Sequence, residues 1–228
     1  MDIVLIAGLW LDGTAWDDVV PELGALGHRA VPVPLPGQGD GDRAATLGDQ
    51  VAAVLAVVDA APGEVLVVGH SAAASLAWVA VDARPGKVAG AVLVGGFPAP
   101  DGRAYADWFP VEDGVVAFPG WGAFEGPDAA DLGREARDRM EAAVVPVPEA
   151  VVKGVVRLTD ERRFDVPVVV VCPEFTPDQA RKWIAGGESP ELARATRVSY
   201  ADIDSGHWPM ITRPRELARL LAEAAGTR

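Results

Sequence analysis

The sequence predicts an α/β protein built on a mostly parallel β-sheet of about six strands, with helices on both faces of the sheet. Its short apolar runs are rich in β-branched residues and are not interrupted by polar ones, which is typical of strands buried on both faces. These runs alternate with longer segments in which apolar residues recur at helical spacing. The alternation favours parallel strands joined by crossover helices.

The individual strands and helices can be assigned in chain order. We expect strands at residues 2–7, 29–35, 64–68, 88–94, 166–172 and 197–203. We expect helices at residues 16–26, 46–58, 72–81, 128–143, 177–185 and 212–225. Pro21 implies a kink or a late start in the first helix, and Thr46 with Asp49 forms a capping box that opens the second.

Residues 98–164 break this alternation, because they carry proline, glycine, aromatic and charged residues with one expected helix. We interpret the segment as a small cap insertion that covers the carboxyl edge of the sheet, where sheets of this kind bind ligands. It is too short to be a separate domain, so residues 1–228 are expected to form a single domain.

Composition and charge limit the partners of the chain. Half of the 228 residues are hydrophobic, and the formal net charge is −13, which disfavours nucleic acid and anionic membranes as partners. No apolar run approaches the roughly 20 residues of a membrane-spanning helix. The first apolar run is too short for a signal peptide and lacks a basic flank, so a cytoplasmic protein is expected. The sequence leaves a monomer and a homodimer open.

One cysteine, Cys172, excludes an internal disulfide and disfavours a cysteine-based metal site. It ends a run of valines, so we interpret it as a buried core thiol.

The stretch around Ser71 is where chemistry is expected. An apolar strand meets Gly69-His70-Ser71-Ala72-Ala73 and then becomes an alanine-rich helix. A strand that turns sharply into a helix can present a strained, exposed serine hydroxyl for attack. The usual pattern G-x-S-x-G ends in glycine, and Ala73 is nearly as small. A turn of this kind can also be purely structural, so the rest of the chain has to distinguish the two interpretations.

A serine nucleophile needs a base that removes its proton, and the chain has three histidines. His207 follows the strand at 197–203, and because parallel strands share one carboxyl edge, it is expected to meet Ser71 there. His28 follows a helix end and is interpreted as a surface residue. His70 is expected to point away from the face that Ser71 presents and to support packing or the loop.

Attack by the serine on a carbonyl creates an oxyanion, which two backbone N–H groups could stabilise. One is the amide of Ala72 at the start of the helix, where N–H groups are unpaired and the helix dipole is favourable. The other is expected from the loop after the first strand, most simply Leu9.

Four stretches of the chain resemble motifs of one family. They are Gly8-Leu9-Trp10 with Gly13 and Trp16, Leu35-Pro36-Gly37-Gln38-Gly39, Gly69-His70-Ser71-Ala72-Ala73, and Gly206-His207-Trp208. In these motifs, and over nearly its whole length, the chain resembles the α/β-hydrolases, in particular the small subfamily with plant methylesterases, hydroxynitrile lyases and bacterial relatives. Where its members often have His-Gly, this chain has Ala7-Gly8. The resemblance implies the α/β-hydrolase fold, a Ser-acid-His triad, and neither cofactor nor metal.

The sequence leaves two candidates for the acid of this triad. The resemblance places it a few residues after the strand at 166–172, on Phe175 or Thr176, neither of which ionises. Glu174 and Asp178 bracket that position, and either could orient His207. We slightly favour Asp178, although both residues are also ordinary for a solvated loop or the first turn of a helix.

Aromatic residues near these motifs suggest a hydrophobic small-molecule substrate. The candidates for substrate contact are Trp10, Phe97, Tyr105, Trp108 and Trp208. Such a lining suits a neutral, apolar ligand, although most of these side chains could equally seal the cap to the sheet.

The main hypothesis is therefore an esterase that acts on a small to medium hydrophobic ester, aromatic or polyketide-like. A second hypothesis keeps the fold but replaces hydrolysis by lyase or cyclase chemistry, with His207 as a general acid or base. A third is a binding protein with an inactive site, which the presence of both Ser71 and His207 argues against.

Overall fold

The computed structural model of the protein describes residues 1–226. Its strands are β1 (Asp2–Ile6), β2 (Arg29–Pro32), β3 (Val65–His70), β4 (Val88–Val94), β5 (Val115–Val116), β6 (Val147–Pro148), β7 (Val168–Cys172) and β8 (Val198–Asp202). Within the described residues, one sheet of six strands has the order β2-β1-β3-β4-β7-β8, and every neighbouring pair in it is parallel. The expected fold class and number of strands are confirmed.

Helices fill most of the connections between the strands. The α-helices are α1 (Val19–Ala25), α2 (Leu47–Ala60), α3 (Ala74–Ala83), α4 (Arg134–Ala143), α5 (Glu149–Val152), α6 (Pro177–Ala185), α7 (Pro190–Arg194), α8 (Pro209–Thr212) and α9 (Pro214–Gly226). The 3-10 helices are η1 (Gly13–Trp16), η2 (Ser71–Ala73), η3 (Trp121–Phe124), η4 (Gly126–Ala129) and η5 (Glu161–Asp165).

Some helix boundaries differ from the expected ones for local reasons. The first helix starts late, at Val19, after a 3-10 turn, as Pro21 implied. The helix expected at 128–143 is divided, because η4 ends at Ala129 and α4 begins only at Arg134, after its N-cap Gly133. The short α7 was not expected. The capping box of Thr46 and Asp49 at the start of α2 is confirmed.

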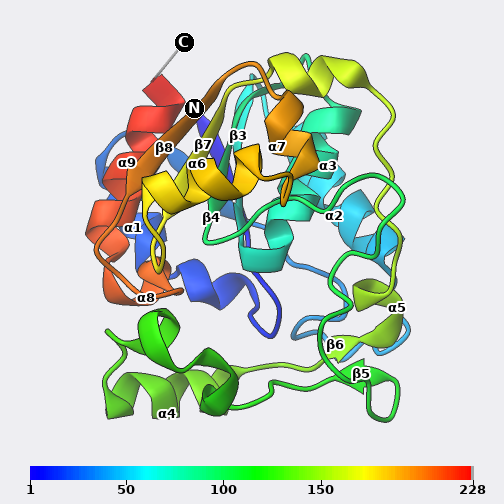
Figure 1. Cartoon of the computed structure of the whole chain (residues 1–228), viewed down its shortest axis with the longest axis vertical. Coiled ribbons are helices and arrows are strands. Elements are labelled where there is room, and N and C mark those ends of the chain that lie inside the picture. The colour runs from blue at the N-terminus through cyan, green and yellow to red at the C-terminus, as the bar shows by residue number, and fades with distance from the viewer. Residues whose placement is uncertain (227–228) are drawn as a thin grey trace.

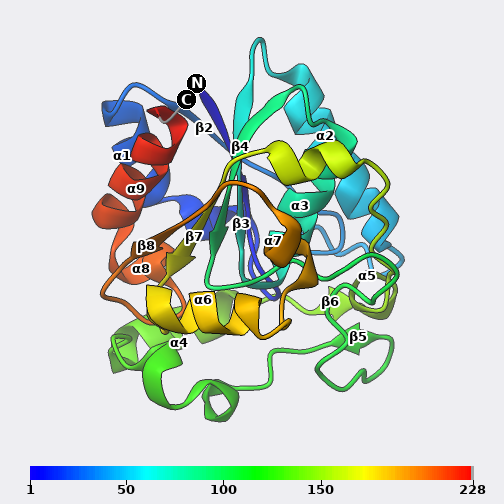
Figure 2. The ribbon, with the colours of Figure 1, turned by 45° about the horizontal axis from the view of Figure 1, so that its top comes forward.

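Alternate residues of the central strands contribute to two cores, one on each face of the sheet. On β1, Val4 and Ile6 belong to the core that α2 and α3 cover, whereas Ile3 and Leu5 belong to the core that α9 covers. Figure 1 and Figure 2 show α1 and α9 on one side of the sheet and α2 and α3 on the other. Burial on both faces explains why the strand sequences are continuously apolar.

The cap segment (residues 98–164) lies between β4 and β7 in the chain and contains the antiparallel pair β5-β6 and α4. Its elements β5, β6 and α4 lie at the bottom of Figure 1, near the loop that follows β1. Trp10 of that loop connects the two, because its indole Nε1–H donates to the carbonyl oxygen of Val116 at 3.2 Å and its carbonyl accepts from Val145 N–H at 2.9 Å. The cap is therefore attached directly to the loop nearest the expected oxyanion site.

The far end of the cap segment is anchored to α3 by buried ion pairs. Arg163 of η5 donates to Glu191 at 2.9 Å and to Asp82 at 3.2 Å, and Trp78 Nε1–H donates to Glu191 at 3.0 Å. Asp82 also accepts the backbone N–H groups of residues 159 and 160. These contacts fix the point at which the chain returns from the cap to β7.

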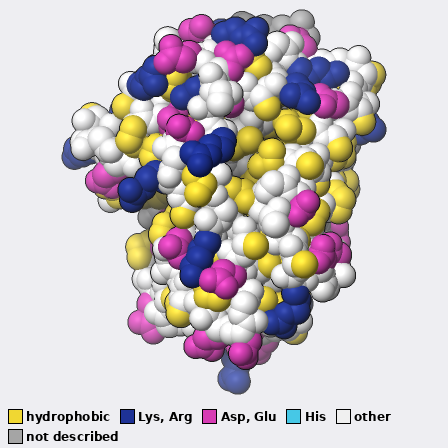
Figure 3. All heavy atoms as spheres, turned by 90° about the vertical axis from the view of Figure 1, so that its right-hand side faces the viewer, with side chains coloured by type: hydrophobic (Ala, Val, Ile, Leu, Met, Phe, Trp, Pro, Cys, Tyr) yellow, Lys and Arg dark blue, Asp and Glu magenta, His cyan; other side chains and the backbone are white. Residues whose placement is uncertain are grey.

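The surface carries both signs of charge. On the face shown in Figure 3, Asp and Glu side chains are interspersed with Lys and Arg, and hydrophobic atoms lie between them. Within residues 1–226, the helices are all too short or too polar to span a membrane. The cytoplasmic location stays a prediction.

Candidate active site

Ser71 stands at the sharp turn between β3 and α3, in the left-handed region of backbone conformation with φ 55°. Such a conformation is costly for a residue with a side chain and is found mostly where function requires it. The turn also depends on a missing side chain, because a Cβ on Gly69 would lie 2.3 Å from the carbonyl oxygen of Ala73. The local geometry is that of a nucleophile elbow.

His207 is paired with Glu174. Its Nδ1 lies 2.8 Å from Oε1 of Glu174, and the two side chains are 12% and 14% exposed. With the carboxylate ionised, Nδ1–H donates to it, which leaves the lone pair of Nε2 free to accept a proton. The pair is largely sheltered from water, so the carboxylate can both orient the ring and stabilise its cation.

Two consecutive glycines after β4 bring the serine turn and the histidine loop together. A Cβ on Gly96 would lie 2.4 Å from the carbonyl oxygen of Ser71, and a Cβ on Gly95 would lie 3.2 Å from Nδ1 of His207. In addition, Nε2–H of His70 donates to the carbonyl oxygen of His207 at 2.8 Å. Ser71 and His207 are thus held at one edge of the sheet.

The acid that contacts His207 is Glu174, and the preference for Asp178 is corrected. Asp178 is 82% exposed and pairs with Arg181 at 2.7 Å on the surface of α6. The reason is local, because Thr176 caps α6 through Gln179 and Asp178 falls in its first, solvent-facing turn. Glu174 lies between the end of β7 and this cap, and its longer side chain reaches the imidazole.

His70 is buried beside the site and remains neutral. Burial, and secondarily the positive charge that His207 can acquire, lower the pKa of His70 to about 3. The hydrogen bond from its Nε2 to the His207 carbonyl leaves Nδ1 buried without a partner in the described chain, which fits the neutral ring. The expected supporting role of His70 therefore has a concrete form, a link between the serine turn and the backbone of the histidine loop.

Two other titratable groups near the site, Cys172 and Asp128, have raised pKa values, which favour their neutral forms. Burial raises the pKa of the Cys172 thiol to about 12, so this residue is an unreactive core thiol. Burial, followed by the charge of Glu174, raises the pKa of Asp128, whose backbone carbonyl accepts the N–H of His207 at 2.7 Å.

The two residues expected to supply the oxyanion amides, Leu9 and Ala72, belong to segments that pack at the serine turn. Gly8 packs directly on the turn, because a Cβ on it would lie 3.1 Å from Cβ of Ser71 and 2.8 Å from Nδ1 of His70. Leu9 follows this tightly packed glycine in the chain, and Ala72 follows Ser71 in η2. Among the turn and loop hydrogen bonds of residues 1–226, the N–H of Leu9 donates to no carbonyl, and Ala72 lies in the first turn of η2, where N–H groups lack an intrahelical acceptor.

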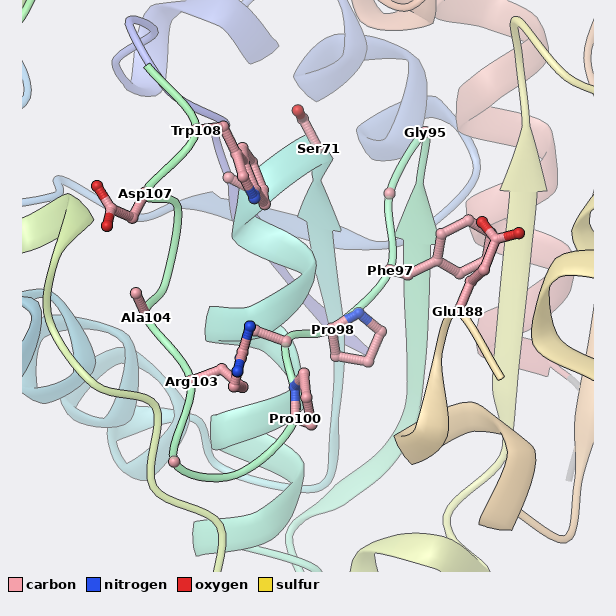
Figure 4. A pocket seen from close by; sticks show the side chains of 14 residues that line it. Ser71, Gly95, Phe97, Pro98, Pro100, Arg103, Ala104, Asp107, Trp108 and Glu188 are labelled. Atoms are coloured by element: carbon pink, nitrogen blue, oxygen red, sulfur yellow. The ribbon is translucent and has the colours of Figure 1, made fainter. Parts of the chain in front are cut away.

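A cavity of about 770 Å³ opens beside Ser71. Figure 4 shows Ser71 with Trp108 on one side and the Gly95–Phe97 loop on the other. The lining residues are Ser71, Ala72, Gly95, Gly96, Phe97, Pro98, Ala99, Pro100, Gly102, Arg103, Ala104, Asp107, Trp108 and Glu188. The lining combines apolar side chains with three charged ones, so the cavity is more polar than the aromatic pocket that the sequence suggested.

Of the five aromatic residues expected to contact substrate, Phe97 and Trp108 line this cavity, and Trp108 is 65% exposed. The other three are buried packing residues. Tyr105 is fully buried in the core, and Trp10 packs against Phe109, Phe118 and Phe124. Trp208 is buried against Trp121 and Phe124, and Phe124 also stacks on the His207 ring at 6.4 Å between centroids. These aromatics seal the cap onto the histidine loop.

Sequence reasoning missed several residues that shape the site. Gly95 and Gly96 follow a buried strand and offer no carboxylate for the triad, but a glycine pair at that place is also a signal of close packing. Gln38 was noted only as part of a motif, yet its buried amide contacts the loop after β1. Nothing in the sequence indicated that Phe124 of the cap would stack on His207.

The family model of the alpha/beta hydrolase family matches residues 3–220. The chain belongs to the alpha/beta hydrolase family. Membership confirms the expected family and places the chain, at the general level, among enzymes of the hydrolase type. No curated protein sequence matches the chain.

Solved structures share the fold at low sequence identity. An extracellular alpha/beta-hydrolase from a Paenibacillus species, with homology to tobacco salicylic acid binding protein 2, is 18% identical, with a TM-score of 0.79 and 98% of each chain covered. The Arabidopsis methylesterase MES16 is 16% identical, with a TM-score of 0.79 and 99% of each chain covered. Tomato methylketone synthase I, in complex with 2-tridecanone, is 17% identical, with a TM-score of 0.76 and coverage of 99% of this chain and 97% of that one. Because one fold serves several chemistries, the activity of this chain has to be argued from its site.

Proposed function

We propose that the protein is a serine esterase that cleaves carboxylic esters through Ser71, His207 and Glu174. The observation that carries this proposal is the sheltered hydrogen bond between His207 Nδ1 and Glu174 at the edge where Ser71 stands in its strained turn. A histidine oriented in this way can act as a base on a serine hydroxyl.

In the first half of the reaction, the Ser71 hydroxyl oxygen attacks the ester carbonyl carbon while its proton passes to Nε2 of His207. The carbonyl π electrons move onto oxygen, and the amides of Leu9 and Ala72 stabilise the resulting anion. When the tetrahedral intermediate collapses, the bond to the alkoxy group breaks. His207 then gives its proton to the departing alcohol, which leaves an acyl group on Ser71.

In the second half, water replaces the alcohol. His207 takes a proton from water as the water oxygen attacks the acyl carbon, and a second tetrahedral intermediate forms in the same oxyanion site. Its collapse breaks the bond to Ser71, whose oxygen recovers the proton from His207. The products are a carboxylic acid and the restored enzyme, and Glu174 stays ionised and hydrogen-bonded throughout.

The cavity supports an ester with a medium-sized apolar group. Its volume of about 770 Å³ is in the range of small-molecule sites, and the prolines of residues 98–100, Phe97 and the exposed indole of Trp108 give apolar contact surface. Trp108 has room to stack on a planar group of the ligand, which favours an aromatic or polyketide-like ester among the possible substrates.

A panel of aryl and methyl esters tests the proposal, with Ser71→Ala as the matched variant. We expect turnover of at least one apolar ester by the wild type and a fall in kcat on the order of 10⁴-fold or more in Ser71→Ala. Unchanged turnover in Ser71→Ala would rule the mechanism out. A phosphonate that labels Ser71 would further support an acyl-enzyme, whereas product formation without labelling would favour the lyase or cyclase alternative.

A further inference from the structure

The loop after β1 contains a strained turn next to the nucleophile. Residues 8–11 form a four-residue turn that is closed by Leu11 N–H on the carbonyl oxygen of Gly8 at 3.4 Å. Its third residue, Trp10, has a positive φ of 63°. Turns that need a positive φ at this position usually have glycine there. A bulky residue in this conformation stores strain, so surrounding contacts have to hold the turn in place.

Gln38 bridges both ends of this turn. Its side-chain Nε2 donates to the carbonyl oxygen of Gly8 at 3.0 Å and to that of Leu11 at 2.6 Å, which uses both hydrogens of the amide. Gln38 is buried, with an exposed fraction of 4%, so these bonds do not compete with solvent. The same side chain thus ties down the first and the last carbonyl of the turn.

The contact with Gly8 has a direct consequence for the oxyanion site. The carbonyl of Gly8 and the N–H of Leu9 belong to one planar peptide group and point in opposite directions. Because Gln38 holds the carbonyl oxygen on its own side, the N–H of Leu9 points away from Gln38. Gly8 also packs on Ser71, so this peptide group lies beside the serine turn. Rotation of this peptide would remove one of the two oxyanion donors without moving any catalytic side chain.

A second buried glutamine fixes which way the Gln38 amide faces. Nε2 of Gln50, on α2, donates to Oε1 of Gln38 at 3.0 Å and to the carbonyl oxygen of Pro36 at 2.9 Å. Because Oε1 of Gln38 accepts this bond, its NH₂ group is left to face Gly8 and Leu11. Gln50 is fully buried, and it connects the first turn of α2 to the oxyanion loop through one intermediate side chain.

We infer that Gln38 is a positioning residue that sets the orientation of the Gly8–Leu9 peptide, and hence of the Leu9 oxyanion donor, with Gln50 holding Gln38 in register. The inference rests on the proposed function in that the oxyanion is the one formed in ester cleavage. Its structural part, the orientation of one peptide group, can be tested separately.

The decisive variant is Gln38→Met, which keeps the length of the side chain and removes both donors. We expect kcat for an ester substrate to fall about 10²-fold, the effect of losing one oxyanion donor, with little change in KM. A boronic acid that forms a tetrahedral adduct on Ser71 should lose affinity by a similar factor. Gln50→Met, which leaves Gln38 in place but frees its amide, should lose about tenfold in both measurements, as an intermediate case.

Val58→Ala is the matched control, because Val58 is a buried residue of α2 that the site does not use. It should lower Tm without changing kcat or boronic acid affinity in the folded protein. If Gln38→Met lowers Tm and behaves like Val58→Ala in both measurements, Gln38 has only a structural role and the inference is wrong. If Gln38→Met does not fold, the same comparison is made with Gln50→Met, and an unchanged boronic acid affinity there overturns the inference.

A crystal structure of Gln38→Met separates this inference from the proposed function. A rotated Gly8–Leu9 peptide is the expected result, and a peptide that keeps its orientation contradicts the inference whatever the activity. Conversely, a wild-type protein in which Ser71 is neither acylated nor phosphonylated would refute the proposed function, while the crystallographic comparison would still decide the role of Gln38.

Discussion

Glu174 and Asp178 follow the same strand and lie close together in the sequence, yet one is sheltered from solvent and the other is exposed. Glu174 is sheltered and bonded to His207, whereas Asp178 is in solvent and bonded to Arg181. Water screens the attraction between two charges, so a buried pair interacts more strongly than an exposed one. The Glu174–His207 pair can therefore orient the imidazole ring, whereas the Asp178–Arg181 pair contributes little to stability.

Replacement of Glu174 by Gln is expected to lower kcat by roughly 10²- to 10⁴-fold. The amide is nearly the same shape, but it no longer stabilises the imidazolium and can favour the wrong tautomer of His207. The measurement is steady-state kinetics with an ester that the wild type hydrolyses. Asp178→Asn is the control and should keep wild-type activity, and a larger loss in Asp178→Asn than in Glu174→Gln would reverse the assignment of the acid.

His70 predicts a pH dependence of stability. Its folded pKa of about 3 lies below the ordinary value of 6.5, so the unfolded chain binds the proton more readily than the folded one. Its contribution to stability is therefore fully present above pH 6.5 and is lost as the pH falls from 6.5 toward 3. The loss is about 1.4 kcal/mol per pH unit well inside that window.

Urea unfolding of the wild type and of His70→Gln between pH 5 and pH 7.5 measures this dependence. Gln retains a side-chain N–H donor for the His207 carbonyl but does not titrate, so its stability should fall less steeply below pH 6.5. His28, whose pKa is also lowered by burial, contributes equally in both proteins. Parallel pH profiles would show that His70 is not buried as a neutral ring.

At the scale of elements, the connections between the cap segment and the sheet depend on a few buried polar contacts. Arg163 neutralises two carboxylates, Asp82 on α3 and Glu191 on α7, at the point where η5 leads back into the sheet. All three side chains are almost completely buried, so each of them needs the others.

Arg163→Met is therefore expected to lower the free energy of unfolding by about 3–5 kcal/mol, because it leaves two buried carboxylates without their partner. Chemical denaturation at pH 7 gives the value. The neighbouring Arg162 pairs with Asp160 at the surface and serves as the control, since Arg162→Met should leave stability near that of the wild type. A comparable effect of the two substitutions would contradict the dominant role of burial.

At the scale of the whole molecule, the cap segment contacts His207, the proposed catalytic base. The N–H of His207 donates to the carbonyl oxygen of Asp128 in η4, and Phe124 of η3 stacks on its ring. The neighbouring Gly206 allows this approach, because a Cβ there would lie 2.2 Å from the same Asp128 carbonyl. We therefore expect that displacing the cap segment would displace His207.

Gly206→Ala should separate the cap from the histidine loop and lower kcat at least tenfold, since a misplacement of about 1 Å in a catalytic group can cost up to 10²-fold. Gly122→Ala is the matched control in the same cap, where an added Cβ meets no atom within 4 Å. Kinetics and Tm are measured for both variants. Equal activity in the two would show that the cap does not position His207.

The sequence by itself determined the six-stranded parallel sheet, the elbow at Ser71, the capping box at Thr46 and the loop that carries His207. These features are recorded locally, in apolar periodicity, in small residues at a turn and in hydrogen-bonding side chains three residues apart. Each of these features depends on residues that are close together in the chain, so local sequence patterns are enough to predict it.

Tertiary structure alone decided which carboxylate reaches His207, which aromatics face the cavity, and that Gln38 contacts Gly8. Glu174 and Asp178 are chemically alike in the sequence, and Trp10 and Trp108 are the same amino acid, but burial and packing separate their roles. The physical reason is that charge strength, solvent access and hydrogen-bond partners depend on distances between residues remote in the chain, and only the packed fold sets those distances.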